Sequence, residues 1–309
     1  MLLLTLISLT AAEPPTRAAE AADTTVPVPP GTRLRLETTQ GEIVVRAWDR
    51  NQVRVQTAGG RRGDVRVRLS GRVLTVDASN FQHPPTGDYD ITVPVWMGLS
   101  LENMNGSITV EGVRAPLEIS TLNGDIRVHG GSESIQLEAL SGQVVLTGAR
   151  GRIDLSTASN HIIATDIQGD LNIEAISGDI VLRNVDSKSV NLETVSGSMY
   201  FGGPIHSEGR YVFSAHSGNT FLGVAEGTNA TISIDLVDGV VQAGFALPLI
   251  ERGRARKQTY RVGNGSAAVQ IESFSGRVHL LRPDEFSTWV TRWEQAHKAK
   301  EQKPKEHQH

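Results

Sequence analysis

Apolar and polar residues alternate in short runs along most of the chain, and the runs are divided by a turn signal in which glycine usually follows serine or asparagine. Five consecutive copies of this signal are spaced by eighteen residues, and the other copies lie at wider spacings. Short alternating runs bounded by glycine predict β-strands separated by tight turns. The turn positions are Gly41, Gly106, Gly124, Gly142, Asn160, Gly178, Gly197, Gly218, Gly239 and Gly276.

The residues around each turn repeat as well. Around Gly124, Leu117 and Ile119 come before the turn, and Ile126 and Val128 come after it. Each repeat is therefore expected to hold two short strands of period two, joined by corners. A further apolar residue two positions before the glycine, such as Leu122, is expected to fill a corner of the core, as is Val113 in the connection before this repeat.

Asn160 replaces glycine within the regular series. Asparagine tolerates the left-handed backbone region better than most non-glycine residues. Its presence indicates that the turn constrains the backbone conformation.

A single repeat cannot bury its own apolar face, whereas stacked repeats form one continuous core. The fixed period therefore favours an all-β fold, a parallel β-solenoid of about eighteen-residue rungs. An antiparallel sandwich or meander is the alternative, because Ser-Gly is also compatible with a hairpin turn.

The rest of the chain suggests the following organisation. Residues 1–12 hold an apolar run followed by two alanines, which predicts a signal peptide. Residues 13–30 are rich in proline, alanine and threonine and are expected to form a linker. Residues 31–98 are expected to form a β-rich N-terminal cap of mostly antiparallel strands, and residues 99–283 the solenoid. Residues 284–309 are expected to form a short amphipathic helix, which could cap the other end, and a charged tail.

Composition excludes several kinds of chemistry. The chain has no cysteine, so disulfides and thiolate metal sites are excluded. The net charge of -4 gives no indication of nucleic-acid binding. Asp125 and Asp179 each follow a turn glycine, but Gln143 and His161 occupy that position in the copies between them, so no acidic ladder is expected there. We predict no catalytic residue, cofactor or metal site. Five histidines lie at different repeat positions: His129, His161, His206, His216 and His279.

Charge is distributed unevenly along the chain. Residues 31–72 hold ten arginines and four acidic residues, whereas residues 101–200 hold six basic and thirteen acidic residues. This asymmetry is compatible with binding to an envelope polymer or with head-to-tail self-association, and it is equally compatible with solvated strand faces.

Several segments carry a family resemblance. These are LRLETTQGEIVVRAWDRNQVRVQ, YDITVPVWMGLSLENMNGSITVEG, the serial NGDI and SGDI turns, and GNGSAAVQIESFSGRVHLL. Over residues 31–283 the chain resembles the bacterial DUF4097 family, whose members are described as adhesin-like or β-strand-repeat proteins. The resemblance implies a mainly parallel β-solenoid in the cell envelope or on the surface, and it supplies no catalytic residues.

The expected function is that of a non-catalytic, exported, structural or adhesin-like β-solenoid whose strand faces contact a partner that the sequence does not identify. Two alternatives stay open: a polysaccharide-binding or polysaccharide-active β-helix, and a scaffold that assembles end to end. The location is expected to be periplasmic or on the cell surface.

Overall fold

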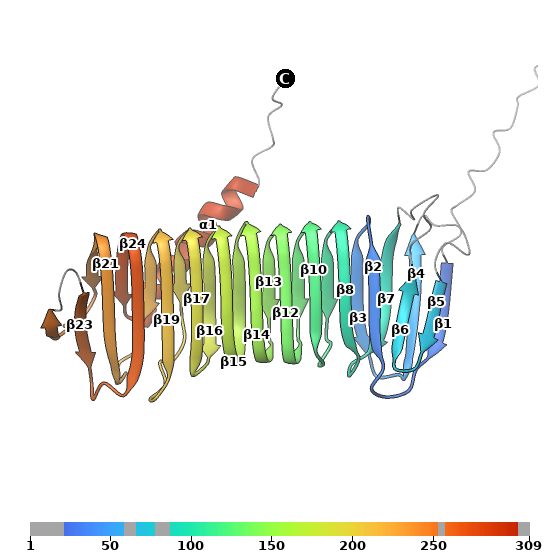
Figure 1. Ribbon diagram of the computed structural model, residues 1–309, viewed down its shortest axis with the longest axis horizontal. Coiled ribbons are helices and arrows are strands. Elements are labelled where there is room, and N and C mark those ends of the chain that lie inside the picture. The colour runs from blue at the N-terminus through green and yellow to red at the C-terminus, as the bar shows by residue number, and fades with distance from the viewer. Residues whose placement is uncertain (1–21, 59–65, 78–86, 253–256, 302–309) are drawn as a thin grey trace, which may run out of the picture.

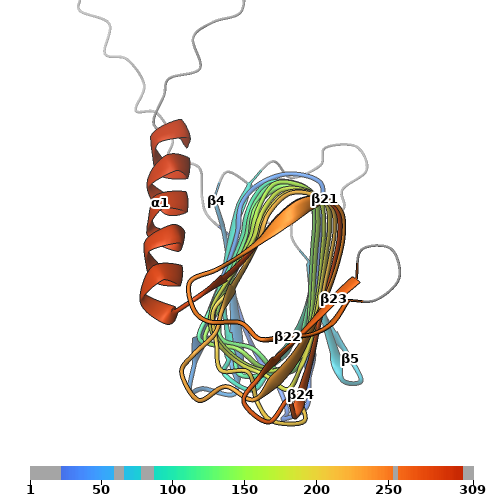
Figure 2. The ribbon, with the colours of Figure 1, turned by 90° about the vertical axis from the view of Figure 1, so that its left-hand side faces the viewer.

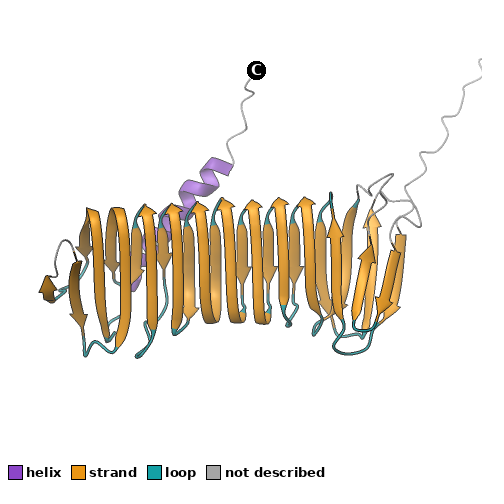
Figure 3. Cartoon of the chain, viewed as in Figure 1, coloured by secondary structure: helices purple, strands orange, loops and turns teal. Residues whose placement is uncertain are grey.

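In the computed structural model the described part of the chain consists mainly of β-strands, with one α-helix near its C-terminal end (Figure 3). The structure describes residues 22–58, 66–77, 87–252 and 257–301. The expected signal peptide at residues 1–12 lies outside the described residues. Part of the expected linker is instead a strand, β1 (Ala22–Pro27), which pairs antiparallel with β4 (Gln52–Ala58). Its Thr24, Thr25 and Val26 are favourable residues for a strand.

The strands form two walls of a long stack (Figures 1 and 2). One turn of the chain, here called a rung, adds one strand to each wall. The first wall holds β6 (Val73–Asp77) and the strands that precede the turn positions: β2 (Arg33–Thr38), β8 (Gly98–Asn105), β10 (Leu117–Asn123), β12 (Ser132–Ser141), β14 (Arg150–Ser159), β17 (Ser189–Ser196) and β19 (Arg210–Ser217). The second wall holds the strands that follow them: β7 (Asp88–Pro94), β3 (Ile43–Trp48), β9 (Ile108–Glu111), β11 (Ile126–His129), β13 (Val144–Thr147), β16 (Ile180–Asp186), β18 (Met199–Phe201) and β20 (Thr220–Gly223). Three long strands run through both walls: β15 (Ile162–Ser177), β21 (Ala230–Ala243) and β24 (Ala267–Leu281).

Equivalent residues of successive rungs pair in parallel. In the first wall Leu117 is paired with Leu99 on one side and Ile135 on the other. In the second wall Ile126 is paired with Ile108 and Val144. The eighteen-residue period thus places like residues above one another, and the antiparallel sandwich or meander does not describe this central region.

The core lies between the walls and follows the alternation of the strands. Leu117, Ile119, Ile126 and Val128 are at most 3% exposed, as the pattern predicts. The expectation for Leu122 is wrong, because its side chain is 42% exposed. Leu117 and Ile119 point inward, so strand alternation sends Leu122 outward and its neighbour at position 121 inward. Val113 is fully buried at its corner, as expected.

The position three before the turn glycine therefore faces the core, and there it is often polar. Thr157 donates a hydrogen bond to the carbonyl of Gly142 in the preceding rung, with an Oγ1–O distance of 3.0 Å. Asn103 donates in the same way to the carbonyl of Gly41, at 2.8 Å. These side chains satisfy turn carbonyls that the parallel ladder leaves beside the core.

The N-terminal region is less antiparallel than the sequence suggests. β2 and β3 form a regular rung that pairs in parallel with β8 and β9. β6 and β7 form a further parallel rung outside it. Among the described strands of this region, antiparallel pairing joins β1 with β4, β4 with β7, and β5 (Arg66–Ser70) with β6. These strands cover the open edge of the stack.

The C-terminal end has a similar crossed order, meaning that the order of the strands in space differs from their order in the sequence. β24 pairs in parallel with β19 and β20 on one side and with β21 on the other, so the last strand of the chain lies inside an earlier one. β23 (Lys257–Val262) then pairs antiparallel with the first part of β21, and β22 (Leu249–Arg252) pairs antiparallel with β23. Both ends therefore finish in antiparallel strands.

The helix α1 (Pro283–Glu301) lies along the outer surface of the second wall, as Figure 2 shows. The sequence suggested instead that it could cap an end of the stack. Its buried side chains are Phe286, Val290 and Trp293, which pack with Val181 and Phe221 of the wall. In the described part of the chain, no helix is long and apolar enough to cross a membrane.

Candidate functional site

The second wall is apolar on its outside where α1 covers it. The third residue after each turn glycine points outward, and it becomes apolar or aromatic toward the C-terminal end of the stack. The paired series is Arg127, Val145, Ile163, Val181, Tyr200, Phe221 and His279. An outward apolar series on one wall supplies the surface against which an amphipathic helix packs.

Two glycines form a socket for Phe286. A Cβ atom added to Gly202 would lie 2.3 Å from the Phe286 ring, and one added to Gly223 would lie 3.4 Å from it. The equivalent residue in the neighbouring rung is Arg183, which pairs with Glu294 of the helix. Glycine at these two positions thus leaves room for the first turn of α1.

Aromatic rings continue the contact. The ring centroids of Tyr200 and Phe221 are 4.5 Å apart, and those of Phe221 and His279 are 4.6 Å apart, each pair with an interplanar angle of 3°. Trp289 lies 4.9 Å from Phe221. Burial raises the pKa of the Tyr200 hydroxyl, and the nearby Asp179 carboxylate adds to this effect. Burial, followed by the Arg277 charge, lowers the pKa of His279.

Between Ser107 and Asn219, the first residues after the turn positions form a hydrogen-bond ladder. The Asp125 carboxylate accepts from the Gln143 N–H at 2.9 Å, and the Asp179 carboxylate accepts from the Ser198 N–H at 2.7 Å. His161 Nδ1 accepts from the Asp179 N–H at 2.9 Å. As the sequence suggested, these positions do not form an acidic ladder; their varied side chains share the ability to accept a hydrogen bond.

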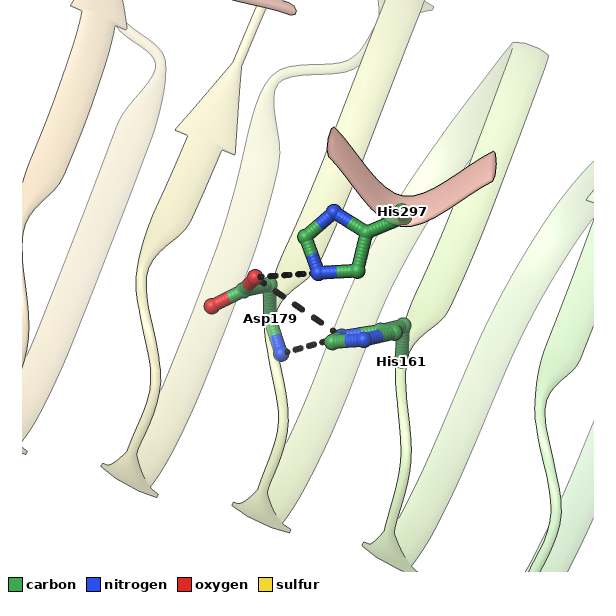
Figure 4. Close-up of side chains that lie close together, drawn as sticks. All are labelled: His161, Asp179 and His297. Carbon is green, nitrogen blue, oxygen red and sulfur yellow. Dashed lines mark hydrogen bonds and ion pairs between the residues drawn. The ribbon is translucent and has the colours of Figure 1, made fainter. Parts of the chain in front are cut away.

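The last turns of α1 meet this ladder at a polar cluster (Figure 4). His161 and Asp179 come from adjacent rungs, and His297 comes from the helix. Asp179 Oδ2 lies 3.7 Å from His161 Nδ1 and 3.7 Å from His297 Nε2. Trp293 Nε1 donates a hydrogen bond to the same carboxylate oxygen at 2.6 Å. The side chains of His161, Asp179 and His297 are 23%, 18% and 21% exposed.

His161 and Asp179 share one repeat position in the sequence, whereas nothing in the sequence connects His297 with them. The repeat places His161 and Asp179 in one column, eighteen residues apart, and that spacing was available in the sequence. The sequence does not show where α1 lies on the wall, so it does not identify His297 as the third member of the cluster.

The other singled-out histidines do not join the cluster. His206 Nε2 lies 2.6 Å from a carboxylate oxygen of Asp186. His216 stacks on Phe274 with ring centroids 5.0 Å apart. His129 is exposed at the end of β11.

The turn glycines form one column along the stack. A Cβ atom added to Gly124 would lie 2.2 Å from the Gly106 carbonyl oxygen, and Gly124 has a φ of +157°. A Cβ atom added to Gly178 would lie 1.8 Å from the Asn160 carbonyl oxygen. Asn160 itself adopts a φ of 140°, and its side-chain oxygen accepts from the His161 N–H at 2.9 Å. Close approach of successive turns therefore adds to the conformational constraint.

The outer surface of the first wall carries an acidic column, formed by the residues four before the turn positions and by Asp77 of β6, which is paired with Glu37. Its eleven paired positions hold eight acidic residues and three serines. In spatial order they are Asp77, Glu37, Glu102, Ser120, Glu138, Ser156, Glu174, Glu193, Ser214, Glu272 and Asp235. Among the described residues, no lysine or arginine forms an ion pair with Glu138, Glu174 or Glu193.

An apolar ridge runs beside this column, two residues before the glycines. Leu122 lies opposite Leu140, because the residues on either side of each are paired. The ridge consists of Met104, Leu122, Leu140, Ala158, Ile176, Val195, His216, Phe274 and Val237. Seven of the twelve large apolar side chains that are exposed in the described residues belong to it, with exposures from 41% to 58%. A groove of about 460 Å³ lies between ridge and column near Val195, Phe274 and Glu193.

Comparison with solved structures finds low-identity neighbours. A "putative cell adhesion protein" from Clostridium sporogenes has 9% identity and a TM-score of 0.25, with 85% of this chain and 100% of that chain covered. A "putative adhesin" from Parabacteroides distasonis has 14% identity and a TM-score of 0.29, with 85% and 97% covered. One from Bacteroides fragilis has 14% identity and a TM-score of 0.31, with 84% and 97% covered.

Curated protein sequences give no match to the chain. The family model described as Toastrack DUF4097, however, matches residues 31–281, which is most of the chain. This match includes the turn copies from Gly41 to Gly276 and agrees with the resemblance seen in the sequence. The chain belongs to the Toastrack DUF4097 family.

Proposed function

We propose that this protein is an exported, non-catalytic β-solenoid that binds its partner through the outer surface of the first wall. The apolar run from Leu2 to Thr10, followed by Ala11 and Ala12, supports export. The acidic column and the apolar ridge, side by side along the wall, are the observation that carries the proposal.

Both parts of this surface are unfavourable for an isolated molecule. Adjacent strands are about 4.8 Å apart, and like charges placed directly opposite one another destabilise a sheet. Glu174 is paired with Glu193, and Glu272 with Asp235. Contiguous exposed apolar side chains are characteristic of interaction surfaces. A partner that neutralises the column and covers the ridge removes both costs.

The partner that fits is a cationic amphipathic polypeptide segment. Side chains two residues apart on one strand face are separated by about 6.7 Å, so the column and the ridge lie within reach of one segment running along the stack. Cationic side chains would face Glu138, Glu174 and Glu193, and apolar side chains would cover Leu140 and Ile176. Charge complementarity would speed association, and the apolar contact would contribute most of the affinity.

The column is less suited to acid–base catalysis on a polysaccharide. A general acid of a glycosidase is usually a carboxyl group whose surroundings keep it protonated near neutral pH. Glu138, Glu174, Glu193 and Glu272 are all exposed to solvent. Incubation with envelope glycans should therefore leave them intact, and depolymerised products would contradict the non-catalytic proposal.

End-to-end assembly has less support than lateral contact. The parallel rungs at both ends are followed by antiparallel strands, with β4 and β5 at one end and β23 at the other. Such strands interrupt the regular parallel edge on which a second stack would have to continue. We expect the protein without its leader to remain monomeric in solution sizing at high concentration; long oligomers would favour the scaffold.

Binding to synthetic peptides tests the proposed surface. The immobilised probe is a peptide of alternating lysine and leucine, and a lysine–serine peptide of equal charge is its comparison. The column variant carries Glu138→Gln, Glu174→Gln, Glu193→Gln and Glu272→Gln. Because each exposed ion pair contributes up to about 1 kcal/mol, we expect this variant to bind the lysine–leucine peptide about tenfold more weakly or worse.

A matched variant removes the same charge elsewhere. Glu42→Gln, Glu111→Gln, Glu226→Gln and Glu251→Gln change exposed residues outside the column. This control variant should bind like the unaltered protein. Equal weakening of both variants, or equal binding of the two peptides, would argue for a general charge effect and against the surface.

A further inference from the structure

The cluster at the end of α1 has the composition of a metal site. We propose that His161, Asp179 and His297 bind a divalent transition-metal ion, with Zn²⁺ as the expected ion, and that the bound ion fastens α1 to the second wall. The proposal concerns the opposite wall from the proposed contact surface and is independent of that function.

The ligand atoms already lie near a shared centre. Asp179 Oδ2 is 3.7 Å from His161 Nδ1 and from His297 Nε2, and one ligand atom from each residue lies within 4.8 Å of the others. Zinc binds nitrogen and carboxylate oxygen at about 2.1 Å, and tetrahedral angles then separate the ligand atoms by about 3.4 Å. Small side-chain movements would therefore bring the three groups into coordination.

Hydrogen bonding orients the two histidine rings beside this centre. His161 Nδ1 accepts from the Asp179 N–H, so this nitrogen carries no proton, and its lone pair has to turn from the N–H to the ion for coordination. His297 Nδ1 lies 2.7 Å from the Trp293 carbonyl oxygen and donates to it, so a neutral ring presents its lone pair on Nε2. The Nε2 lone pair of His297 then faces the Asp179 carboxylate at 3.7 Å, and a cation between them would replace this repulsion with attraction.

The surrounding groups provide the support that metal ligands require. The Trp293 indole N–H and the Ser198 N–H each hold one carboxylate oxygen of Asp179, at 2.6 and 2.7 Å. The Trp293 carbonyl orients His297. Hydrogen bonds of this kind from outside the ligand set fix ligand orientation and contribute to metal affinity.

Coordination by His161 Nδ1 would replace one hydrogen bond of the wall ladder. A metal–imidazole bond compensates for the loss of one such bond, which contributes about 1 kcal/mol. Because the three side chains are partly exposed, water can occupy the remaining coordination position. A set of two imidazoles and one carboxylate favours zinc over the hard cations Mg²⁺ and Ca²⁺.

The wall itself suggests conservative variants. Gln143 occupies the ladder position next to His161, and Asn219 occupies an equivalent position farther along. His161→Gln and Asp179→Asn therefore keep a ladder acceptor while removing a metal ligand of the required type. His297→Gln removes the helix ligand, and Trp293→Phe removes the indole donor to the carboxylate while keeping an aromatic ring against the wall. His129→Gln is the control, because His129 lies outside the cluster.

Calorimetric titration with ZnCl₂ tests the site in the full chain. His83, His307 and His309 lie outside the described residues, so the titration is repeated in a background carrying H83Q, H307Q and H309Q. We expect one bound Zn²⁺ per chain in that background, no comparable binding of MgCl₂ or CaCl₂, and at least tenfold weaker zinc binding in each ligand variant. Trp293→Phe should weaken binding about tenfold. His129→Gln should bind normally.

Hydrogen exchange provides the structural readout. Zn²⁺ should slow amide exchange in α1 of the background protein and leave it unchanged in His297→Gln. If the background protein no longer binds one zinc ion per chain, the zinc bound by the full chain belongs to His83, His307 or His309, and the proposal is overturned. Unaltered zinc affinity in all three ligand variants would also overturn the proposal. So would a titration in which the cluster binds no zinc.

Discussion

At the scale of single residues, close approach and backbone conformation act together in the turn column. Gly124 combines a positive φ with a Cβ position only 2.2 Å from a carbonyl oxygen. Gly71, between β5 and β6, also has a positive φ, of +58°, but no atom lies within 4 Å of its Cβ position. The two glycines therefore separate the effect of a steric clash from that of the backbone angle alone.

Gly124→Ala should reduce the free energy of unfolding by about 3 kcal/mol, because it adds a clash with backbone to conformational strain. Gly71→Ala should cost about 1 kcal/mol, the strain contribution alone. Denaturant unfolding of both variants measures these differences. Equal losses would show that close packing of successive turns contributes nothing.

His279 gives a residue-scale prediction for pH. Burial, helped by Arg277, lowers its pKa from 6.5 in the folded state, so the unfolded chain binds the proton more readily. The contribution of this group to stability is therefore complete above about pH 6.5 and is lost as the pH falls below that value. His279→Phe should reduce the stability difference between pH 7.5 and pH 5.5, whereas His129→Gln should leave the contribution of His279 in place. Identical pH profiles for His279→Phe and the unaltered protein would contradict this assignment.

At the scale of elements, the sequence predicted the strands better than it predicted the docking of the helix. The two strands around Gly124 followed directly from the alternation, because their inward residues Leu117, Ile119, Ile126 and Val128 are aliphatic. Leu122 was assigned to the core because it is apolar, although strand alternation places it on the outward face. Thr121 takes the inward position, and its hydroxyl donates a hydrogen bond to the Gly106 carbonyl. The helix was predicted from the spacing of its apolar residues. Its position on the wall depends on the socket at Gly202 and Gly223, which forms only when the strands are stacked.

Phe286→Ala tests this docking. Removal of the ring should weaken the attachment of α1 by about 3 kcal/mol, because it leaves the socket empty. Hydrogen exchange should accelerate throughout α1 and remain unchanged in β10 and β12, since stacked rungs depend mainly on their neighbours. Ser287→Ala is the control, because the Ser287 hydroxyl bonds only the Pro283 carbonyl within the helix. Cooperative loss of protection in β10 would contradict independent docking.

At the scale of the whole molecule, the two walls have different surroundings. α1 covers part of the second wall, whereas the acidic column and the ridge extend along the outside of the first. The uneven charge was visible in the sequence, but its concentration into one column depends on which strands are neighbours. The crossed rung order at both ends places Glu37 beside Glu102 and Glu272 beside Ser214, and no linear spacing indicates those pairs.

The column variant also tests the energetic argument. Neutralising Glu138, Glu174, Glu193 and Glu272 should raise the free energy of unfolding by about 1 kcal/mol at low ionic strength, because it relieves repulsion between paired carboxylates. Salt should diminish the gain, since exposed charges are screened. The control variant should show no such gain. A less stable column variant would indicate that these carboxylates support the fold rather than a partner.

The most direct measurement of the contact surface uses the absence of cysteine from the chain. Single cysteines at Leu140→Cys and Ile176→Cys on the ridge, and at Thr147→Cys on the second wall, each carry an environment-sensitive fluorophore. Addition of the lysine–leucine peptide should shift the emission of both ridge labels to shorter wavelength and leave the Thr147→Cys label unchanged. An equal shift at all three positions, or a shift confined to Thr147→Cys, would contradict the assignment of the first wall as the contact surface.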